Sequence, residues 1–336
     1  MNFKQVFITG GAGYVGSALV PTLLNKGYKV VVYDLYLYGD VLQPHHNLTQ
    51  IKGDIRDKNK IIESSKSCDI FIHLACISND PTFELNPELS KKVNFDAFEP
   101  LVKISKEGGV KRFIYASTCS VYGVSDAENV TEDHPLLPIT DYNKYKGLCE
   151  PVLLKYQSPD FTTTIIRPAT VCGYSPRQRF DLTVNILTNH GYNKNHITVF
   201  GGKQERPNIH IADITDLYVM LLEIPESKIA GKIYNAGYQN KSIADIALIV
   251  RDVMAQEFPE KPKATIETTP SDDIRSYRIS SEKIKRELGF VPQHTIEDAV
   301  RDLIQAFKAG KFIDSMNNSR YYNIRTLKAL ESQCAA

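Results

Sequence analysis

The sequence lacks several features that would assign a protein to a class at once. Its 336 residues contain no run of 18 consecutive apolar residues, so no membrane-spanning helix is expected. The short apolar run near the N-terminus ends in glycines, which argues against a signal peptide. None of the six cysteines belongs to a CxxC pair, so no zinc or other metal site is expected.

An excess of charge of one sign is also missing. Lys and Arg together number 40 and Asp and Glu 39, which gives a net charge of +1. Nucleic acids and anionic membranes favour proteins with a basic surplus, so neither is expected as a partner. Without an export signal, the scattered cysteines are expected to be reduced and mostly buried, and the protein is expected to be cytoplasmic.

What is present is the composition and patterning of an α/β protein. Apolar residues make up 42% of the chain and charged residues 24%, as in ordinary globular proteins. Short β-branched strands alternate with helices, which predicts a Rossmann-type doubly wound parallel sheet covered on both faces. The expected strands are Gln5–Thr9, Lys29–Tyr33, Asp69–His73, Arg112–Ala116 and Thr162–Ile166, and the expected helices include Tyr14–Asn25, Leu89–Glu107 and Tyr142–Tyr156.

This alternation becomes irregular after about residue 170. We therefore expect a cofactor-binding domain over residues 1–170, with a later segment at about 207–240 returning to it. Residues 171–336 are expected to form mainly a smaller α/β lobe that binds the substrate, followed by a tail. In that lobe Ser242 and Thr295 look like N-caps of helices. The tail Phe312–Ala336 is polar without a clear period, so it is expected to wrap the body or to be partly mobile.

The segment TGGAGYVG, which ends at Gly16, follows the first predicted strand and opens the first predicted helix. Gly10, Gly13 and Gly16 permit a tight turn and a close approach of the backbone to a pyrophosphate. The helix N-terminus then offers free N–H groups to the anion. Together with Tyr14 and Val15, these glycines are predicted to bind a dinucleotide.

Two acidic residues extend this prediction. Asp34 stands 18 residues after Gly16, at the end of the second strand. A carboxylate there accepts hydrogen bonds from ribose hydroxyls and repels a 2′-phosphate, and no Arg or Lys follows within Leu35–Tyr38, so NAD is favoured over NADP. Asp54 and Ile55 are placed to meet the adenine ring, although Asp54 also fits the role of a helix cap.

A base for alcohol oxidation is offered by Tyr142 and Lys146. Their YxxxK spacing puts them one helical turn apart on one face. An ammonium group beside the phenol is expected to lower the tyrosine pKa toward working pH. A second hydroxyl is expected at the end of the preceding strand, where Ser117, Thr118 and Ser120 stand.

These motifs in this order resemble the extended short-chain dehydrogenase/reductases, and more narrowly the NAD-dependent nucleotide-sugar epimerase/dehydratase family. The resemblance covers about residues 3 to 310. It implies that Tyr142 is the general base, that Lys146 is its partner and also holds the nicotinamide ribose, and that Thr118 bonds the sugar 4-hydroxyl, with Ser117 and Ser120 as alternatives. It also implies cofactor contacts by Leu74, Ala75 and Asn94, of which Asn94 also fits an ordinary polar position in a helix.

The same resemblance implies a site for the substrate in the second half. Arg206, in a GxxxR…HxxD stretch, and Arg275 match positions that bind the substrate diphosphate, and paired guanidiniums suit phosphate oxygens. Thr170 stands where the family usually has Asn. Arg177 and Arg179 lie in a stretch that resembles enzymes of surface-polysaccharide sugars, including GDP-heptose 4-dehydrogenases. They are expected to reach a nucleotide or sugar, with a structural ion pair to Asp181 as the alternative.

The expected activity is NAD-dependent oxidation at C4 of a nucleoside-diphosphate sugar, foremost as a 4-epimerase in polysaccharide sugar biosynthesis. A 4-dehydrogenase or a 4-keto-sugar reductase is the alternative, and a non-catalytic NAD-binding scaffold is a remote one. Cys119 and Ser120 stand where 4,6-dehydratases of the family have Asp-Glu, which disfavours that reaction. By family habit a homodimer is expected, through Leu89–Glu107 and Tyr142–Tyr156 packed as a bundle.

Overall fold

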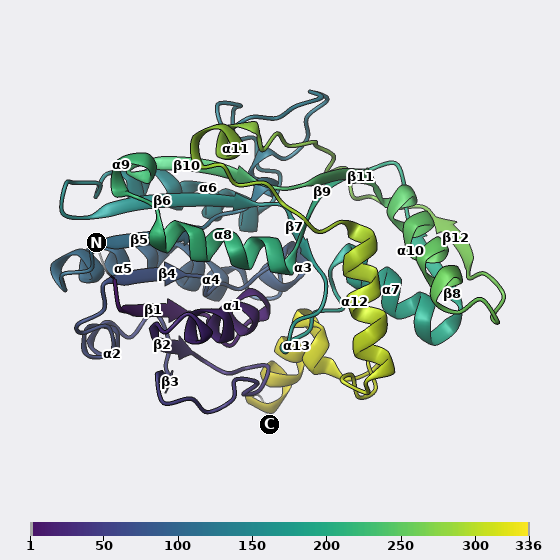
Figure 1. Ribbon diagram of the computed structural model, residues 1–336, viewed down its shortest axis with the longest axis horizontal. Helices are drawn as coiled ribbons and strands as arrows, with labels where there is room; N and C mark the ends of the chain where they lie inside the picture. The colour runs from purple at the N-terminus through teal and green to yellow at the C-terminus, as the bar shows by residue number, and fades with distance from the viewer. Residues whose placement is uncertain (1–2, 335–336) are drawn as a thin grey trace.

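The computed structural model describes residues 3–334. Its largest element is a seven-stranded sheet in the order β3-β2-β1-β4-β5-β6-β10, in which every pair of neighbours is parallel. The predicted doubly wound α/β fold is thereby confirmed (Figure 1). The strands are β1 Gln5–Thr9, β2 Lys29–Asp34, β3 Leu48–Lys52, β4 Ile70–His73, β5 Arg112–Ala116, β6 Thr162–Pro168 and β10 Lys232–Ala236.

Alternate residues of each strand point to opposite sides of the sheet. Because both sets include apolar residues, helices cover both faces. In β1, Val6 and Ile8 pack toward one core and Phe7 toward the other. The first core is closed by α1 Tyr14–Asn25, α8 Ile211–Glu223, α9 Glu226–Ile229 and α11 Glu282–Leu288. The second is closed by α2 Lys58–Ser64, α5 Phe98–Glu107 and α6 Asp141–Leu154.

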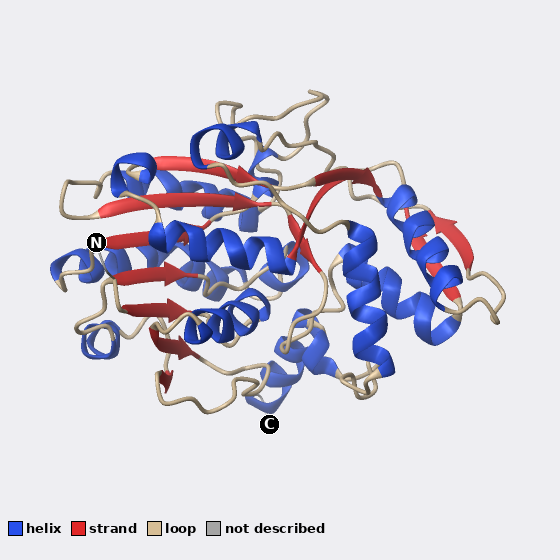
Figure 2. Cartoon of the chain, in the orientation of Figure 1, coloured by secondary structure: helices blue, strands red, loops and turns tan. Residues whose placement is uncertain are grey.

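A smaller lobe lies beside the carboxyl ends of the strands, on the right in Figures 1 and 2. It contains a three-stranded sheet β11-β9-β7 and a two-stranded sheet β12-β8. Ser242 and Thr295 cap α10 and α12 as expected, the latter in a capping box with Asp298. Its elements are β7 Thr170–Cys172, α7 Thr183–Lys194, β8 His196–Phe200, β9 Glu205–His210, β11 Gln239–Ser242, α10 Ile243–Glu257, β12 Thr265–Thr269 and α12 Ile296–Lys308.

Two helical predictions need correction. The continuous helix expected over Leu89–Glu107 is divided into α4 Pro87–Lys91 and α5 by a π-helical turn, η1 Lys92–Asp96. The tail, for which no helix was expected, forms α13 Asn323–Cys334. Among residues 3–334, no helix is long and apolar enough to cross a bilayer.

Candidate active site

A cavity of about 840 Å³ lies at the carboxyl edge of the seven-stranded sheet. This is the edge where open α/β sheets bind ligands, and β1 and β4 flank the point at which the strand order reverses. The cavity is lined by the turn after β1, the ends of β2, β4 and β5, the start of α6, the loop after β7, and α13. It therefore collects residues from both halves of the chain.

The glycine turn is shaped for a close backbone approach. A Cβ on Gly10, which has φ +75°, would lie 2.6 Å from the Ala75 nitrogen, and a Cβ on Gly16 would lie 2.5 Å from the Gly11 oxygen. Gly13 precedes α1 and lines the cavity with Tyr14. Side chains at Gly10 and Gly16 would thus break the turn that presents the helix N-terminus. This cradle fits a dinucleotide pyrophosphate.

Asp34 lies at the end of β2 on the cavity wall. Its carboxylate accepts hydrogen bonds from the backbone N–H groups of Ala12, at 3.0 Å, and Tyr36, at 2.8 Å. Burial raises the pKa of Asp34, and these hydrogen bonds oppose the rise. The carboxylate is therefore fixed beside the glycine turn, in the position expected for binding ribose hydroxyls.

Asp54 and Ile55, which are predicted to meet the adenine ring, also line the cavity. Asp54 is paired with Arg56, which the sequence argument did not consider. The Arg56 guanidinium donates to Asp54 at 2.6 Å, and this hydrogen bond lowers the pKa of Asp54. Its carboxylate consequently meets a ligand while already bonded to Arg56.

Leu74 and Ala75 line the cavity directly after β4, whereas Asn94 does not. The Asn94 amide instead accepts from the Ile77 N–H at 2.8 Å and donates to the Ile77 carbonyl at 2.9 Å. The Asn94 amide is thus engaged by the Ile77 backbone, and its contact with the cofactor stays a prediction. Asn94 lies in the π-turn η1 and positions the loop after β4, so it supports the cavity wall from behind.

Tyr142 and Lys146 lie in the first turns of α6 and both line the cavity. The Lys146 ammonium donates to the Ala116 carbonyl and lies 4.5 Å from the centre of the Tyr115 ring. Burial, together with Cys76 and Asp80, raises the pKa of Tyr142, and the largest lowering influence is the charge of Arg179. The expected lowering by Lys146 is therefore wrong for the protein chain alone.

Three hydroxyl groups follow β5, and they differ in what they contact. Thr118 caps a 3-10 turn, Cys119–Tyr122, and its Oγ1 lies 2.8 Å from Ser120 Oγ. Ser120 in turn donates to the Asn143 side chain. Ser117 is buried and donates at 2.6 Å to Glu150, behind the cavity wall. All three residues line the cavity, and the Ser117 hydroxyl already donates its hydrogen to Glu150.

The two arginines expected to bind a diphosphate come together at the lobe side of the cavity. Both Arg206, at 2.8 Å, and Arg275, at 2.7 Å, donate to Asp273. Arg275 also pairs with Asp80, which accepts a hydrogen bond from Thr140, the N-cap of α6. Burial would raise the pKa of Asp273, but Arg275 and Arg206 lower it to about 2. The guanidiniums are therefore held by carboxylates that a phosphate would have to displace.

Arg179 and Arg177 both line the cavity, as does Thr170 at the start of β7. Arg179 forms the ion pair with Asp181 that was the alternative expectation, at 2.8 Å, and one of its terminal nitrogens has no partner among the described residues. Arg177 instead stacks on Tyr38, with 3.7 Å between its Cζ and the ring centre. Its place beside the β2 end lies on the cofactor side of the cavity.

Sequence reasoning missed two supports of the site. Glu150 and Arg167 form a buried ion pair at 2.6 Å that joins α6 to β6. Asn323 at the start of α13 is buried and donates to Ser78 at 2.8 Å. The spacing of these residues carries no motif, and the polar tail gave no helical period that would have placed Asn323.

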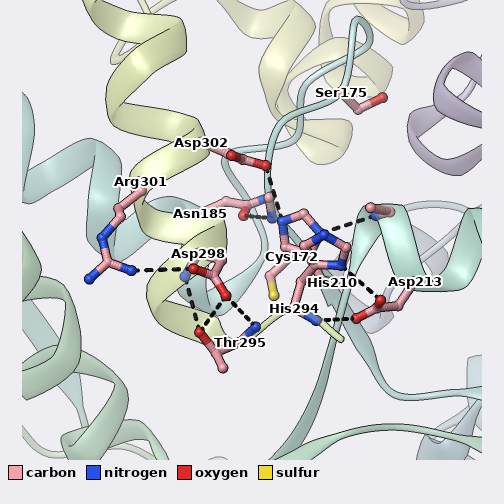
Figure 3. A network of polar contacts seen from close by, with 12 residues as sticks. Cys172, Ser175, Asn185, His210, Asp213, His294, Thr295, Asp298, Arg301 and Asp302 are labelled. Atoms are coloured by element: carbon pink, nitrogen blue, oxygen red, sulfur yellow. Dashed lines mark hydrogen bonds and ion pairs between the residues drawn. The ribbon is translucent and has the colours of Figure 1, made fainter. Parts of the chain in front are cut away.

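The HxxD stretch belongs to a network behind the site, shown in Figure 3. His210 and His294 stack with ring centres 4.9 Å apart. His294 pairs with Asp213 at 2.8 Å, and His210 lies 3.2 Å from Asp302 of α12. This network ties β9 and α8 to α12 and contributes no side chain to the cavity. The described residues contain no group of three or more potential ligands arranged for a metal ion.

The glycine turn, the acid after β2 and the tyrosine–lysine pair define an α/β enzyme that uses a dinucleotide. A model of the NAD dependent epimerase/dehydratase family matches residues 6–237, and the chain belongs to this family. Its cofactor is NAD.

Individual relatives differ in the reaction that they catalyse. The chain is 27% identical to a UDP-glucose 4-epimerase of Corynebacterium glutamicum, covering 88% of this chain and 94% of the relative. It is also 27% identical to a UDP-N-acetyl-alpha-D-glucosaminuronate decarboxylase of Bacillus cytotoxicus, covering 91% and 98%. The NAD-bound structure of DesIV, a dTDP-glucose 4,6-dehydratase of Streptomyces venezuelae, superposes with a TM-score of 0.80 at 22% identity, covering 95% and 98%. Three reactions are thus represented at similar distance.

Proposed function

We propose that the protein oxidises C4 of a nucleoside-diphosphate sugar and acts as a nucleotide-sugar 4-epimerase in the synthesis of polysaccharide sugars. The observation that carries the proposal is the shared cavity. It joins the dinucleotide cradle to Tyr142, Lys146 and Thr118 on one side and to Arg206 and Arg275 on the other. A ligand that spans these groups has an anionic end and an oxidisable alcohol.

In this proposal each side chain has a separate task. Tyr142 takes the proton of the 4-hydroxyl, while NAD accepts the hydride when bound. Lys146 is anchored on the Ala116 carbonyl, and in the proposal its remaining N–H groups serve the base and the cofactor ribose. Because burial raises the Tyr142 pKa, the phenol is neutral before the cofactor and substrate bind. It therefore becomes a base only in the loaded site.

When the diphosphate binds, its oxygens are proposed to replace a carboxylate as the partner of an arginine. Arg206 and Arg275 are already gathered at one place by Asp273. Phosphate oxygens bind a guanidinium fork in pairs, so a diphosphate can replace the contact between Arg275 and Asp80. Asp80 is then free of its arginine at the edge of the cavity that also contains Tyr142.

A 4,6-dehydratase reaction is disfavoured by the residues after Thr118. Cys119 is buried and donates to the Arg167 carbonyl at 2.8 Å, and Ser120 is neutral. Neither supplies the carboxylic acid and base that elimination of water requires. The second candidate is a 4-dehydrogenase or 4-keto-sugar reductase, which is favoured by the resemblance of the stretch around Arg177 and Arg179 to GDP-heptose 4-dehydrogenases.

The proposal is tested with a panel of UDP-, GDP-, CDP- and dTDP-sugars. Each is incubated with the holoprotein, and the C4 centre is followed by NMR. Inversion at C4 without free keto sugar supports the epimerase, and release of a 4-keto sugar supports the dehydrogenase. A 6-deoxy product would establish the dehydratase and overturn the proposed reaction.

We also propose a homodimer formed through α5 and α6. These helices pack together on one face of the sheet, and Leu148 of α6 is 42% exposed on the outside. A second copy of the same helices would bury such apolar surface as a bundle. Sedimentation equilibrium is expected to give twice the chain mass, and a monomer at every concentration would refute the dimer.

A further inference from the structure

Arg177 is a buried cation without a carboxylate partner. The residue is 3% exposed, its Nε has no hydrogen-bond partner, and no carboxylate within residues 3–334 forms an ion pair with it. Burial, with the charge of Arg179, lowers the pKa of Arg177 to about 10. The charges of Asp181 and Asp34 raise this pKa, but neither carboxylate forms an ion pair with Arg177, and a buried charge without such a partner is costly. Because Arg177 also lines the cavity, this charge points to an anionic ligand.

The position of Arg177 indicates which anion it meets. Its backbone N–H donates at 3.1 Å to Ser17 Oγ, in the first turns of α1 and directly after Gly16. Its guanidinium stacks on Tyr38, beyond the end of β2. The Arg177 backbone thus lies against the first turns of α1, and its guanidinium lines the same cavity as the glycine cradle, which is expected to receive a pyrophosphate.

The C-terminal helix holds Arg177 there. Asn323 Oδ1 accepts a hydrogen bond from the Arg177 guanidinium, Asn323 Nδ2 donates to Ser78 at 2.8 Å, and the Asn323 backbone N–H donates to Asp181 at 3.1 Å. Ser78 follows β4 and Ser17 follows the turn after β1, so these contacts join α13 and Arg177 to the segments after two neighbouring strands. Helix α13, yellow in Figure 1, packs against α3 Asp80–Phe83 and lines the cavity with Ile324, Leu327 and Leu330.

We propose that Arg177 is a further cofactor-binding residue that pairs with the diphosphate of NAD, and that Asn323 of α13 is the positioning residue that closes this contact over the cofactor. A guanidinium offers five donors in one plane, so Arg177 retains donors for phosphate oxygens while bonded to Asn323. A 2′-phosphate is disfavoured as its partner because Asp34 lies in the same corner. The proposal holds for any of the sugar reactions considered above.

The test compares Arg177→Gln, Arg177→Lys and Asn323→Ala with the unchanged protein. Arg320→Gln is the matched control, since Arg320 is an exposed arginine of the same C-terminal segment outside the cavity. Calorimetry gives the dissociation constants of NAD, NADP, ADP-ribose and adenosine. Gel filtration gives the NAD retained per chain, and thermal unfolding is recorded with and without NAD.

Arg177→Gln is expected to raise the dissociation constants of NAD and ADP-ribose by about tenfold to a hundredfold, because charged hydrogen bonds to phosphate are lost. Adenosine, which has no phosphate, should bind unchanged. Arg177→Lys should lose part of the affinity for NAD, and Asn323→Ala should retain several-fold less NAD per chain after gel filtration. Without NAD, Arg177→Gln should unfold at the same temperature as the unchanged protein or higher, because an uncompensated buried charge is removed.

Three results would overturn the proposal. If Arg177→Gln loses equal affinity for adenosine and ADP-ribose, Arg177 contacts the nucleoside. If it loses affinity for NADP alone, Arg177 contacts a 2′-phosphate. A lower unfolding temperature without NAD, combined with unchanged affinities, would make Arg177 purely structural. If Arg177→Gln does not fold, the test rests on Arg177→Lys and Asn323→Ala. Unchanged NAD affinity and unchanged NAD retention in both variants would contradict the proposal.

Discussion

Removal of the Glu150 carboxylate would leave Arg167 as a buried cation without the carboxylate of its ion pair, bonded only to the Tyr122 hydroxyl and the Glu132 carbonyl. Glu150 and Arg167 have side-chain exposures of 2% and 4% and are joined by hydrogen bonds of 2.6 and 3.0 Å. Ser117 adds a third bond to the same carboxylate at 2.6 Å. Burial would lower the pKa of Arg167, but Glu150 raises it, so the guanidinium stays charged. Breaking such a pair costs about 3–5 kcal/mol.

We therefore expect Glu150→Ala to reduce the free energy of unfolding by about 3–5 kcal/mol. The double variant Glu150→Ala/Arg167→Met should lose much less than the sum of the two single variants, because both charges are then absent. Urea unfolding followed by circular dichroism measures these values at one fixed NAD concentration, since bound NAD stabilises the folded chain. A loss below about 1 kcal/mol for Glu150→Ala would show that the pair is replaceable by solvent and would refute the reasoning.

Three further predictions concern the cofactor, the base and the lobe. Tyr142→Phe should lower turnover by about 10²–10⁴-fold, the usual value for a general base, while NAD content measured on the purified protein stays the same; full activity would remove Tyr142 from the mechanism. Asp34→Ala should weaken the binding of NAD and reduce the difference in affinity between NAD and NADP, both measured by calorimetry. A parent protein that binds NADP more tightly than NAD would contradict the cofactor assignment. The hydrogen bond to Asp213 raises the pKa of His294. The pair therefore stabilises the fold fully below the ordinary histidine pKa, and this stabilisation is lost as pH rises through the pKa of folded His294. His294→Gln should lower the free energy of unfolding by up to about 1 kcal/mol at acid pH and by less at basic pH. A loss that does not change with pH would disprove this pairing.

Much of the fold was predictable because its signals are local. Strands such as Gln5–Thr9 are buried on both faces and read as continuous apolar runs. The glycines before α1 must lie at fixed offsets from the strand to form the turn. The caps at Ser242 and Thr295 likewise depend on residues three positions away. Each of these features requires only neighbours in the chain.

The features of the fold and site that the sequence did not predict depend on contacts between distant segments. Asn94 turns to Ile77, 17 residues away, and Arg177 meets Asn323 across 146 residues, so no spacing rule indicates either pair. The apolar residues Ile324, Leu327 and Leu330 of helix α13 line the cavity, which is built mostly from residues far away in the chain. The pKa of Tyr142 was misjudged because the spacing to Lys146 says nothing of burial.

The central claim is that a hydrogen leaves C4 of a nucleotide sugar as hydride, with Tyr142 taking the proton. It is tested most directly by giving the holoprotein a substrate from the panel that carries deuterium at C4 and following one turnover. The account predicts that deuterium appears transiently in the bound dinucleotide in the unchanged protein, and that Tyr142→Phe suppresses this transfer. Conversion of the sugar with the deuterium never leaving C4 would contradict it.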